Sequence, residues 1–148
     1  MISKRNVHSD SETIIHDYEY RVRFSEVDSL GIVWHGHYIS YFEEGREAFG
    51  RAYELTYLGI KAQGYTVPIV KTECEHKLPV KYGEIIRIET KFINTPAAKI
   101  VFEFRIYNQE NKLVCVGKSI QVFLDTNGNL SLNNPPFYMD WKRINGLS

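Results

Sequence analysis

Long apolar runs are missing from this 148-residue chain, and so is an excess of charge of one sign. Without a run of roughly 18 apolar residues, we expect no membrane helix. Eighteen basic residues balance eighteen acidic ones, so no summed field attracts nucleic acid or an anionic membrane. The polar first dozen residues lack the apolar core of a signal peptide. We expect a soluble, cytoplasmic protein that neither binds nucleic acid nor inserts into a membrane.

Cysteine is also scarce, with Cys74 and Cys115 far apart in the sequence and no C-x-x-C pair. Both fall in stretches typical of strands, where a thiol usually packs as a small apolar side chain. We interpret them as reduced core residues and favour this over a disulfide.

The composition that remains is that of one globular domain. Hydrophobic residues make up 43% and aromatic residues 14% of the chain, which suits an aromatic-lined core or groove. We predict a flexible arm at residues 1–13 and a single domain at residues 14–132. The Asn-Asn-Pro-Pro sequence that follows predicts an irregular tail at residues 133–148.

Two different periods of hydrophobicity follow one another near the N-terminus. Apolar and polar residues alternate over residues 17–24, which predicts a strand with one buried face. After a loop at residues 25–36, apolar residues recur every three or four positions over residues 38–57, which predicts a long helix. Gly59 is the expected left-handed end of that helix.

Within this helix, Ser40 and Glu43 have the spacing of a capping box. Gly45 lies in mid-helix, where it costs about 1 kcal/mol relative to alanine. Close approach of a strand to the helix would explain this glycine.

Four more strands are predicted, at about residues 70–78, 86–92, 100–106 and 113–124. Their connections are too short for parallel crossovers, so the sheet is mainly antiparallel. The last stretch is apolar on both faces, which places it centrally in the sheet, and His76 is interpreted as a core histidine. The predicted fold is α+β, with one long helix wrapped by a curved sheet of five or six strands.

The most informative stretch is VRFSEVDSLGIVWHGHY at residues 22–38, followed by YFEEGR at residues 41–46. It resembles the hotdog-fold thioesterases of the 4-hydroxybenzoyl-CoA thioesterase type, including the branch acting on short-chain acyl-CoA and acyl carrier protein. Those proteins carry D-x-D-x-x-G, G-[IV]-V-[YW]-H-x-x-Y and F-E-x-x-R in this order. The likeness extends over residues 18–124. Glu26 replaces the usual Asp, and His37 replaces an Asn or another small polar residue.

The resemblance implies a hotdog fold and hydrolysis of an acyl-CoA or acyl carrier protein thioester. It implies no cofactor beyond the coenzyme A of the substrate. Asp28 and His35 match the positions that the family uses at its active site, and Glu26 is a secondary catalytic candidate. The candidate substrate contacts are Gly36, His37, Tyr38 and Lys99.

The residues support this chemistry by themselves. A thioester releases a thiol of pKa about 8.5, so its hydrolysis needs a placed carboxylate and an oxyanion site but no strong acid. A helix starting just after His35 presents unpaired N–H groups with about half a positive charge. Gly31 and Gly36 let the backbone approach the acyl group. The resemblance implies that Asp28 either attacks the carbonyl or activates a water, and His35 is expected to contribute mainly its backbone N–H.

Other interpretations remain for the same residues. Asp28 is also suited to a turn, and His35 to a helix cap. His35 and His37 without further close ligands make a weak metal motif, and we expect no metal. Four lysines are candidates for the phosphates of coenzyme A, with Lys99 favoured because the sequence preceding it matches the region where the family's strand edge meets the pantetheine arm. The four are Lys77, Lys81, Lys99 and Lys118.

Two other functions compete with hydrolysis. A non-catalytic module that binds acyl thioesters has no need of a carboxylate such as Asp28 beside the carbonyl. A hotdog dehydratase would need a catalytic histidine with a carboxylate on the facing subunit's helix, and this pattern differs from that.

One helix and about five strands leave a sheet edge and the face around Asp28 uncovered. We therefore predict a homodimer in which the two sheets join, or a dimer of dimers, with each active site at the interface.

Overall fold

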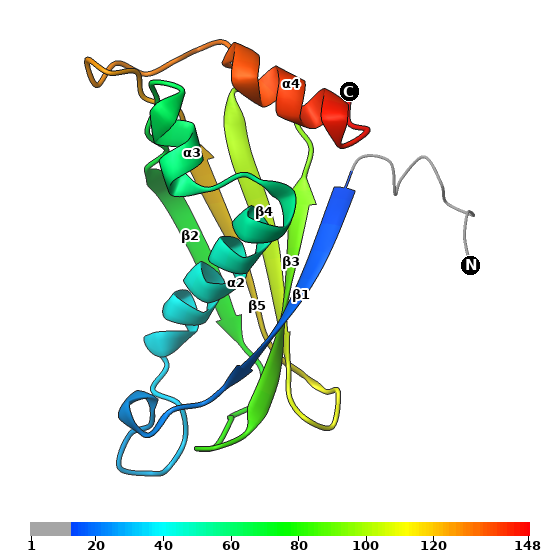
Figure 1. The fold of residues 1–148 in the computed structure, drawn as a ribbon. Helices are drawn as coiled ribbons and strands as arrows, with labels where there is room; N and C mark the ends of the chain where they lie inside the picture. Colours follow the sequence, from blue (N-terminus) through cyan, green and yellow to red (C-terminus); the bar gives the residue numbers. More distant parts are fainter. Residues whose placement is uncertain (1–12) are drawn as a thin grey trace.

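The computed structural model describes residues 13–148 as one curved sheet with a long helix against one face (Figure 1). Its strands are β1 (Thr13–Arg21), β2 (Ile69–His76), β3 (Ile85–Ile93), β4 (Lys99–Tyr107) and β5 (Leu113–Val122). Its helices are the short 3₁₀ turn η1 (Phe24–Glu26), α2 (His37–Tyr53), α3 (Tyr57–Ala62) and α4 (Pro136–Ile144). Of the predicted arm, Thr13 begins β1 and residues 1–12 lie outside the described residues.

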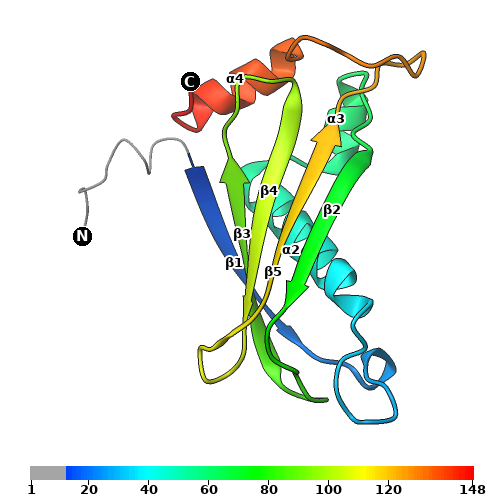
Figure 2. The same ribbon diagram turned by 180° about the vertical axis from the view of Figure 1, so that it is seen from behind.

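The sheet confirms the predicted antiparallel arrangement. Its strand order is β1-β3-β4-β5-β2 and every neighbouring pair is antiparallel. Seen from behind, β5 lies between β4 and β2 (Figure 2), which confirms the central place predicted from its two apolar faces. β1 and β2 form the two edges. No helix within residues 13–148 is long and apolar enough to cross a membrane, and the cytoplasmic location stays a prediction.

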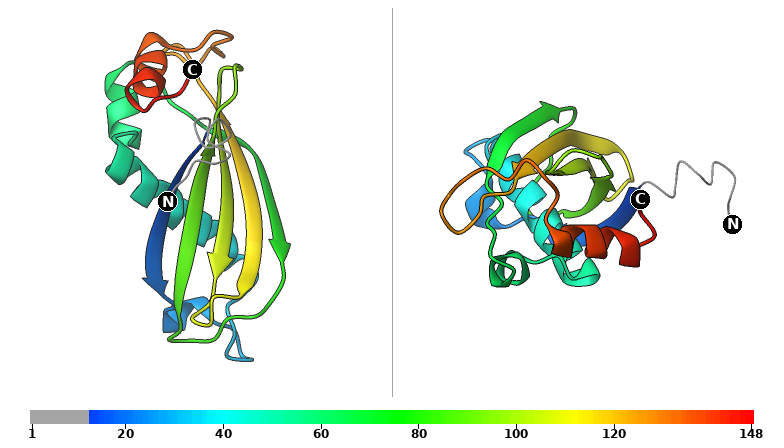
Figure 3. Two further views of the ribbon diagram at one scale, coloured as in Figure 1. Left: turned by 90° about the vertical axis from the view of Figure 1, so that its right-hand side faces the viewer. Right: turned by 90° about the horizontal axis from the view of Figure 1, so that it is seen from above.

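Helix α2 lies across the concave face of the sheet, as the side view shows (Figure 3). Its buried aromatic residues interleave with those of the strands, and the Phe42 ring stacks on Phe104 with centroids 4.7 Å apart. A Cβ added at Gly45 would lie 2.5 Å from Thr90 Oγ1 and 2.6 Å from Ile88 Cγ2. The predicted reason for this glycine, close approach of a strand, is thus confirmed.

The ends of α2 differ from the prediction. Gly36 occupies the N-cap position, so Ser40 and Glu43 lie inside the helix and form no capping box. The helix ends earlier than expected, because Glu54 adopts the left-handed conformation at φ 59°. Gly59 is instead part of α3, where its N–H donates to Thr56 Oγ1 at 3.0 Å.

The predicted irregular tail is wrong for residues 136–144, which form α4. Pro136 in the first turn favours a helix, because its missing N–H would have no partner there. Tyr138 and Trp141, one turn apart, are buried against the end of the sheet and α2. The Trp141 indole donates to the Tyr53 carbonyl at 2.8 Å, so α4 also satisfies the C-terminus of α2.

Two predicted burials are wrong as well. His76 is exposed rather than in the core, because β2 is an edge strand of the sheet. Phe24 lies beyond the end of β1, in η1, and is 75% exposed. In both cases apolar and polar residues do alternate along the chain, but this alternation does not show whether another element covers the apolar face.

Candidate active site around the start of helix α2

The loop that carries Asp28 is held by its own backbone. The Asp28 N–H donates to the Ile32 carbonyl and the Gly31 N–H donates to the Asp28 carbonyl, both at 2.9 Å. Gly31 has φ +78°, a conformation that an L-residue adopts only with strain. The loop therefore needs glycine at this position for its turn.

The Asp28 side chain is exposed, and one carboxylate oxygen is free. Its Oδ1 accepts a hydrogen bond from the Leu30 N–H at 2.8 Å, an Asx turn of the kind that the sequence also allowed. Its Oδ2 accepts no hydrogen bond from residues 13–148. The turn thus orients the carboxylate and leaves one oxygen to take a proton or attack a carbon.

Glu26, the second carboxylate, is engaged on both oxygens. Its Oε2 accepts from the Tyr20 hydroxyl at 2.5 Å, and its Oε1 from the Tyr41 hydroxyl at 2.9 Å and the Arg23 N–H at 2.8 Å. Burial and the bond to Glu26 raise the pKa of both phenols. Glu26 therefore fastens the loop to β1 and α2, and its oxygens are less available for chemistry than Asp28 Oδ2.

The backbone N–H groups of His35 and Gly36 donate no hydrogen bond to any residue in the described part of the chain. Both groups lie at the start of α2, where the helix dipole favours negative charge. A Cβ on Gly36 would lie 2.2 Å from the Trp34 ring, so glycine lets this ring cover the turn. These two N–H groups are the free donors that an oxyanion site requires.

Three rings gather beside these donors. The Tyr38 ring packs against His76 with centroids 5.0 Å apart, and the His35 ring lies 6.3 Å from that of His76. The His37 ring packs against Trp34, with centroids 5.6 Å apart. Burial raises the pKa of Tyr38 to about 12, so its hydroxyl stays neutral. The exposed His76 is a neighbour of this site that the sequence assigned to the core.

Lys99 does not join the other candidates within one chain. It begins β4 beside α4, and its carbonyl accepts from the Tyr138 hydroxyl at 3.0 Å. Asp28 lies at the opposite end of the sheet, beside Lys81, which pairs with Ile32 of the same loop. Lys81 is thus the better placed of these two lysines for a phosphate near Asp28.

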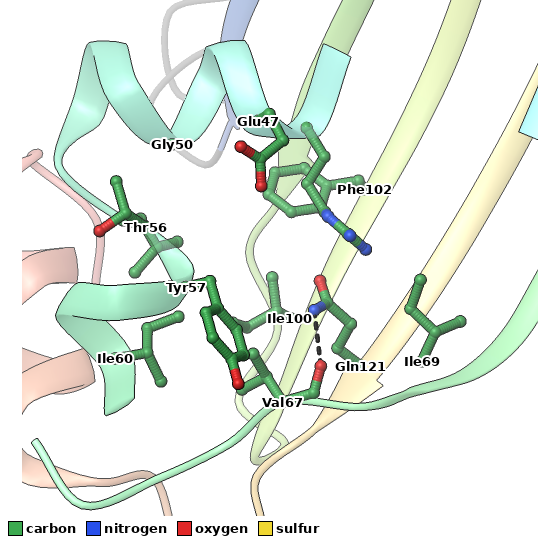
Figure 4. Close-up of a pocket in the computed structure, with 12 residues that line it drawn as sticks. Glu47, Gly50, Thr56, Tyr57, Ile60, Val67, Ile69, Ile100, Phe102 and Gln121 are labelled. Atoms are coloured by element: carbon green, nitrogen blue, oxygen red, sulfur yellow. Dashed lines mark hydrogen bonds between the residues drawn. The ribbon is translucent and has the colours of Figure 1, made fainter. Parts of the chain in front are cut away.

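A pocket of about 300 Å³ opens farther along α2, which the sequence did not indicate (Figure 4). Its lining combines the second half of α2, α3 and the starts of β2 and β4 with the end of β5. Its apolar wall is formed by Ile60, Val67, Ile69, Ile100 and Phe102. On one side, the Gln121 amide donates to the Val67 carbonyl at 2.8 Å. Arg46 and Glu47 also line it, so the pocket combines an apolar wall with charged side chains; the apolar wall suits a small hydrophobic group.

Comparison with known proteins decides the family. The model of the thioesterase-like superfamily matches residues 22–141. The chain belongs to this superfamily. It is 28% identical over 123 residues to YneP of Bacillus subtilis, assigned as an acyl-CoA thioesterase, covering 83% of this chain and 89% of YneP. It is 24% identical over 113 residues to the acyl-CoA thioester hydrolase YbgC of Escherichia coli, covering 76% and 84%.

Solved structures confirm the predicted fold of this superfamily member. A DHNA-CoA thioesterase from Staphylococcus aureus superimposes with a TM-score of 0.75 at 20% identity, over 88% of this chain and 87% of that one. The α+β hotdog architecture is therefore shown. Family and relatives together make the chain an enzyme of the thioester hydrolase class.

Proposed function

We propose that the protein hydrolyses an acyl-CoA thioester at the start of α2. The observation that carries this proposal is that one carboxylate oxygen and two backbone N–H groups of the same region are all without a hydrogen-bond partner among residues 13–148. They are Asp28 Oδ2 and the N–H groups of His35 and Gly36, and all belong to one loop and the helix that follows it. The names of YneP and YbgC, both given for acyl-CoA thioesters, support the substrate class.

In this mechanism the free N–H groups receive the carbonyl oxygen and hold the negative charge that develops on it. Asp28 removes a proton from a water molecule, whose oxygen bonds to the carbonyl carbon. The C–S bond then breaks, the thiolate takes up the proton, and a carboxylic acid remains. No cofactor enters beyond the coenzyme A of the substrate.

Asp28 could instead attack the carbonyl carbon itself, forming an anhydride that water then opens. A single turnover in ¹⁸O-labelled water identifies the anhydride route when the water attacks the anhydride at the Asp28 carbonyl. If the water attacks the anhydride at the Asp28 carbonyl, ¹⁸O enters the Asp28 peptide. The general-base route leaves that peptide unlabelled, and its label appears only in the product acid.

We propose further that the acyl chain occupies the pocket beside α3. Within one chain this pocket is remote from Asp28, because Arg46 on its wall follows His37 by nine residues, which is about 13 Å of helix. A two-fold axis that pairs two β2 edges would run the two α2 helices antiparallel on one joined sheet. The start of one helix would then lie beside the second half of the other.

This arrangement gives the predicted homodimer a reason, since each active site would combine the loop of one chain with the pocket of its partner. The exposed edge supports it. Lys77 donates its N–H to the Val114 carbonyl on β5, and N–H directions alternate along a strand. Hence the N–H groups of Thr72 and Cys74 point away from the sheet, free to pair with a second β2.

The test is hydrolysis of a panel of acyl-CoA and acyl carrier protein thioesters of increasing chain length, with the released thiol measured by a thiol reagent. We expect the protein to hydrolyse at least one acyl-CoA of the panel while it remains folded under the assay conditions. Tight binding of acyl-CoA without release of thiol would instead identify a non-catalytic acyl-binding module and overturn the proposal.

A further inference from the structure

Three side chains of the kind that bind metal ions, two thiols and an imidazole, meet on one face of the sheet at the end nearest the start of α2. They are Cys74 and His76 of β2 and Cys115 of β5. The strands place them there, because His76 lies directly opposite Cys115 in the antiparallel pairing, and Cys74 is two residues before His76 on the same face. Figure 2 shows the two strands side by side.

The two donor-atom distances that involve Cys74 are close to those of metal ligands, and a small shift of the exposed His76 ring would close the third. Cys74 Sγ lies 3.5 Å from Cys115 Sγ and 3.7 Å from His76 Nε2, and the three donor atoms all lie within 4.8 Å of one another. In a tetrahedral zinc site, bonds of about 2.3 Å to sulfur and about 2.0 Å to nitrogen separate two sulfurs by about 3.8 Å and sulfur from nitrogen by about 3.5 Å.

We propose that Cys74, His76 and Cys115 form a binding site for a thiophilic divalent metal ion, with Zn²⁺ as the fitting ion. Two thiolates and one imidazole are a ligand set that zinc accepts, and they leave a fourth tetrahedral position for water. His35 lies outside the group of donor atoms within 4.8 Å of one another, so it is not one of the three ligands.

The environment of the three donors suits a bound ion. Cys115 is fully buried, Cys74 is half-buried and His76 is exposed, so the site has a rigid floor and an open side for metal entry. Burial raises the pKa of both thiols. A metal ion must therefore displace the thiol protons on binding, which costs part of its binding free energy. The bound ion would tie the edge strand β2 to β5 beside Tyr38.

This proposal is independent of the hydrolytic mechanism, because no step assigned to Asp28 passes through the metal. The reduced full-length protein, freed of metal by a chelator, is titrated with Zn²⁺ and separately with Co²⁺. We expect one ion per chain, thiolate-to-cobalt charge-transfer absorption from two sulfurs, and a higher melting temperature with zinc, since the folded state holds the three ligands together and binds zinc more tightly than the unfolded chain does.

The variant that decides is His76→Gln, because an exposed side chain can be changed without disturbing the core. We expect it to bind Zn²⁺ at least tenfold more weakly, with its melting temperature no longer raised by zinc. Cys74→Ser should halve the sulfur contribution to the cobalt spectrum. The control is His16→Gln, which changes a histidine on β1, remote from the three ligands, and should bind zinc as the wild type does.

Two results would overturn the site. One is a wild-type protein with both thiols reduced that takes up no stoichiometric Zn²⁺ at micromolar concentration. The other is a folded His76→Gln variant with unchanged zinc affinity and cobalt spectrum. Neither result depends on whether the protein hydrolyses thioesters.

Discussion

The Tyr41 hydroxyl donates a hydrogen bond of 2.9 Å to the Glu26 carboxylate. Tyr41 is a fully buried residue of α2, and Glu26 ends the turn that leads into the Asp28 loop. This bond fastens the loop to the helix whose N–H groups complete the candidate site, and the bond from Tyr20 fastens it to β1. Glu26 thus positions the loop that carries the Asp28 carboxylate.

Replacement of Glu26 by Ala should therefore mainly lower the free energy of unfolding. It leaves the hydroxyls of Tyr20 and Tyr41 without their acceptor, which costs roughly 1–3 kcal/mol. Urea denaturation measures this loss, and Glu19→Ala, an exposed glutamate of β1, is the control with little expected change. A Glu26→Ala variant with wild-type stability and no activity would show that Glu26 acts in the chemistry itself.

Replacement of Asp28 by Asn should abolish most of the activity and leave stability unchanged. The amide oxygen still accepts from the Leu30 N–H, but it neither takes a proton nor attacks the carbonyl, a loss on the order of 10²–10⁴ in rate. The readout is kcat/KM for the best thioester of the panel.

A matched control exists in a second Asx turn, where Asp125 Oδ1 accepts from the N–H groups of Asn127 and Asn129. Asp125→Asn makes the same chemical change away from the site and should keep full activity. Activity of Asp28→Asn within threefold of wild type would reduce Asp28 to a turn residue.

Substitutions of His35 test whether its backbone or its ring serves the reaction. His35→Ala keeps the free N–H and should cost roughly tenfold or less in kcat, whereas His35→Pro removes the N–H and should be far more damaging. Melting curves establish that both variants fold. If His35→Ala is as inactive as Asp28→Asn, the imidazole is a primary catalyst and the role given to its N–H is wrong.

The pocket beside α3 should set the acyl chain length. Val67→Phe adds a ring to its wall and should lower kcat/KM for long chains relative to short ones by roughly tenfold or more. Leu58→Phe adds a ring on α3 at a side chain that is 73% exposed and not part of the wall, so it should leave the preference unchanged. An identical shift in both variants, or none in Val67→Phe, would place the acyl chain elsewhere.

The β2 edge should carry the dimer. Thr72→Pro removes an N–H that points away from the sheet, so it should weaken dimerisation while the monomer fold survives. Light scattering over a concentration series measures this, with Thr72→Val, which keeps the N–H, as the control. A wild-type protein that is monomeric at micromolar concentration and fully active would contradict the proposed dimer.

Local sequence determined much of this protein. Alternation and helical periodicity are properties of neighbouring residues, so they located the central strand β5, the antiparallel connections and most of α2. The spacing of Asp28, His35 and Gly36 likewise indicated the candidate site, because one short loop and a helix start hold all three. Gly45 even revealed the close approach of Ile88.

Contacts between distant segments decided the rest. Trp141 contacts the end of α2, 88 residues away in the sequence. Without knowledge of this packing, the prolines at the start of α4 predict only an interruption of regular secondary structure. His76 was assigned to the core because its own strand alternates, whereas its exposure depends on the position of β2 at the sheet edge. Cys74 and Cys115 are 41 residues apart. Only the pairing of β2 with β5 brings their sulfurs together, since strand pairing is a property of the folded sheet and not of either strand alone.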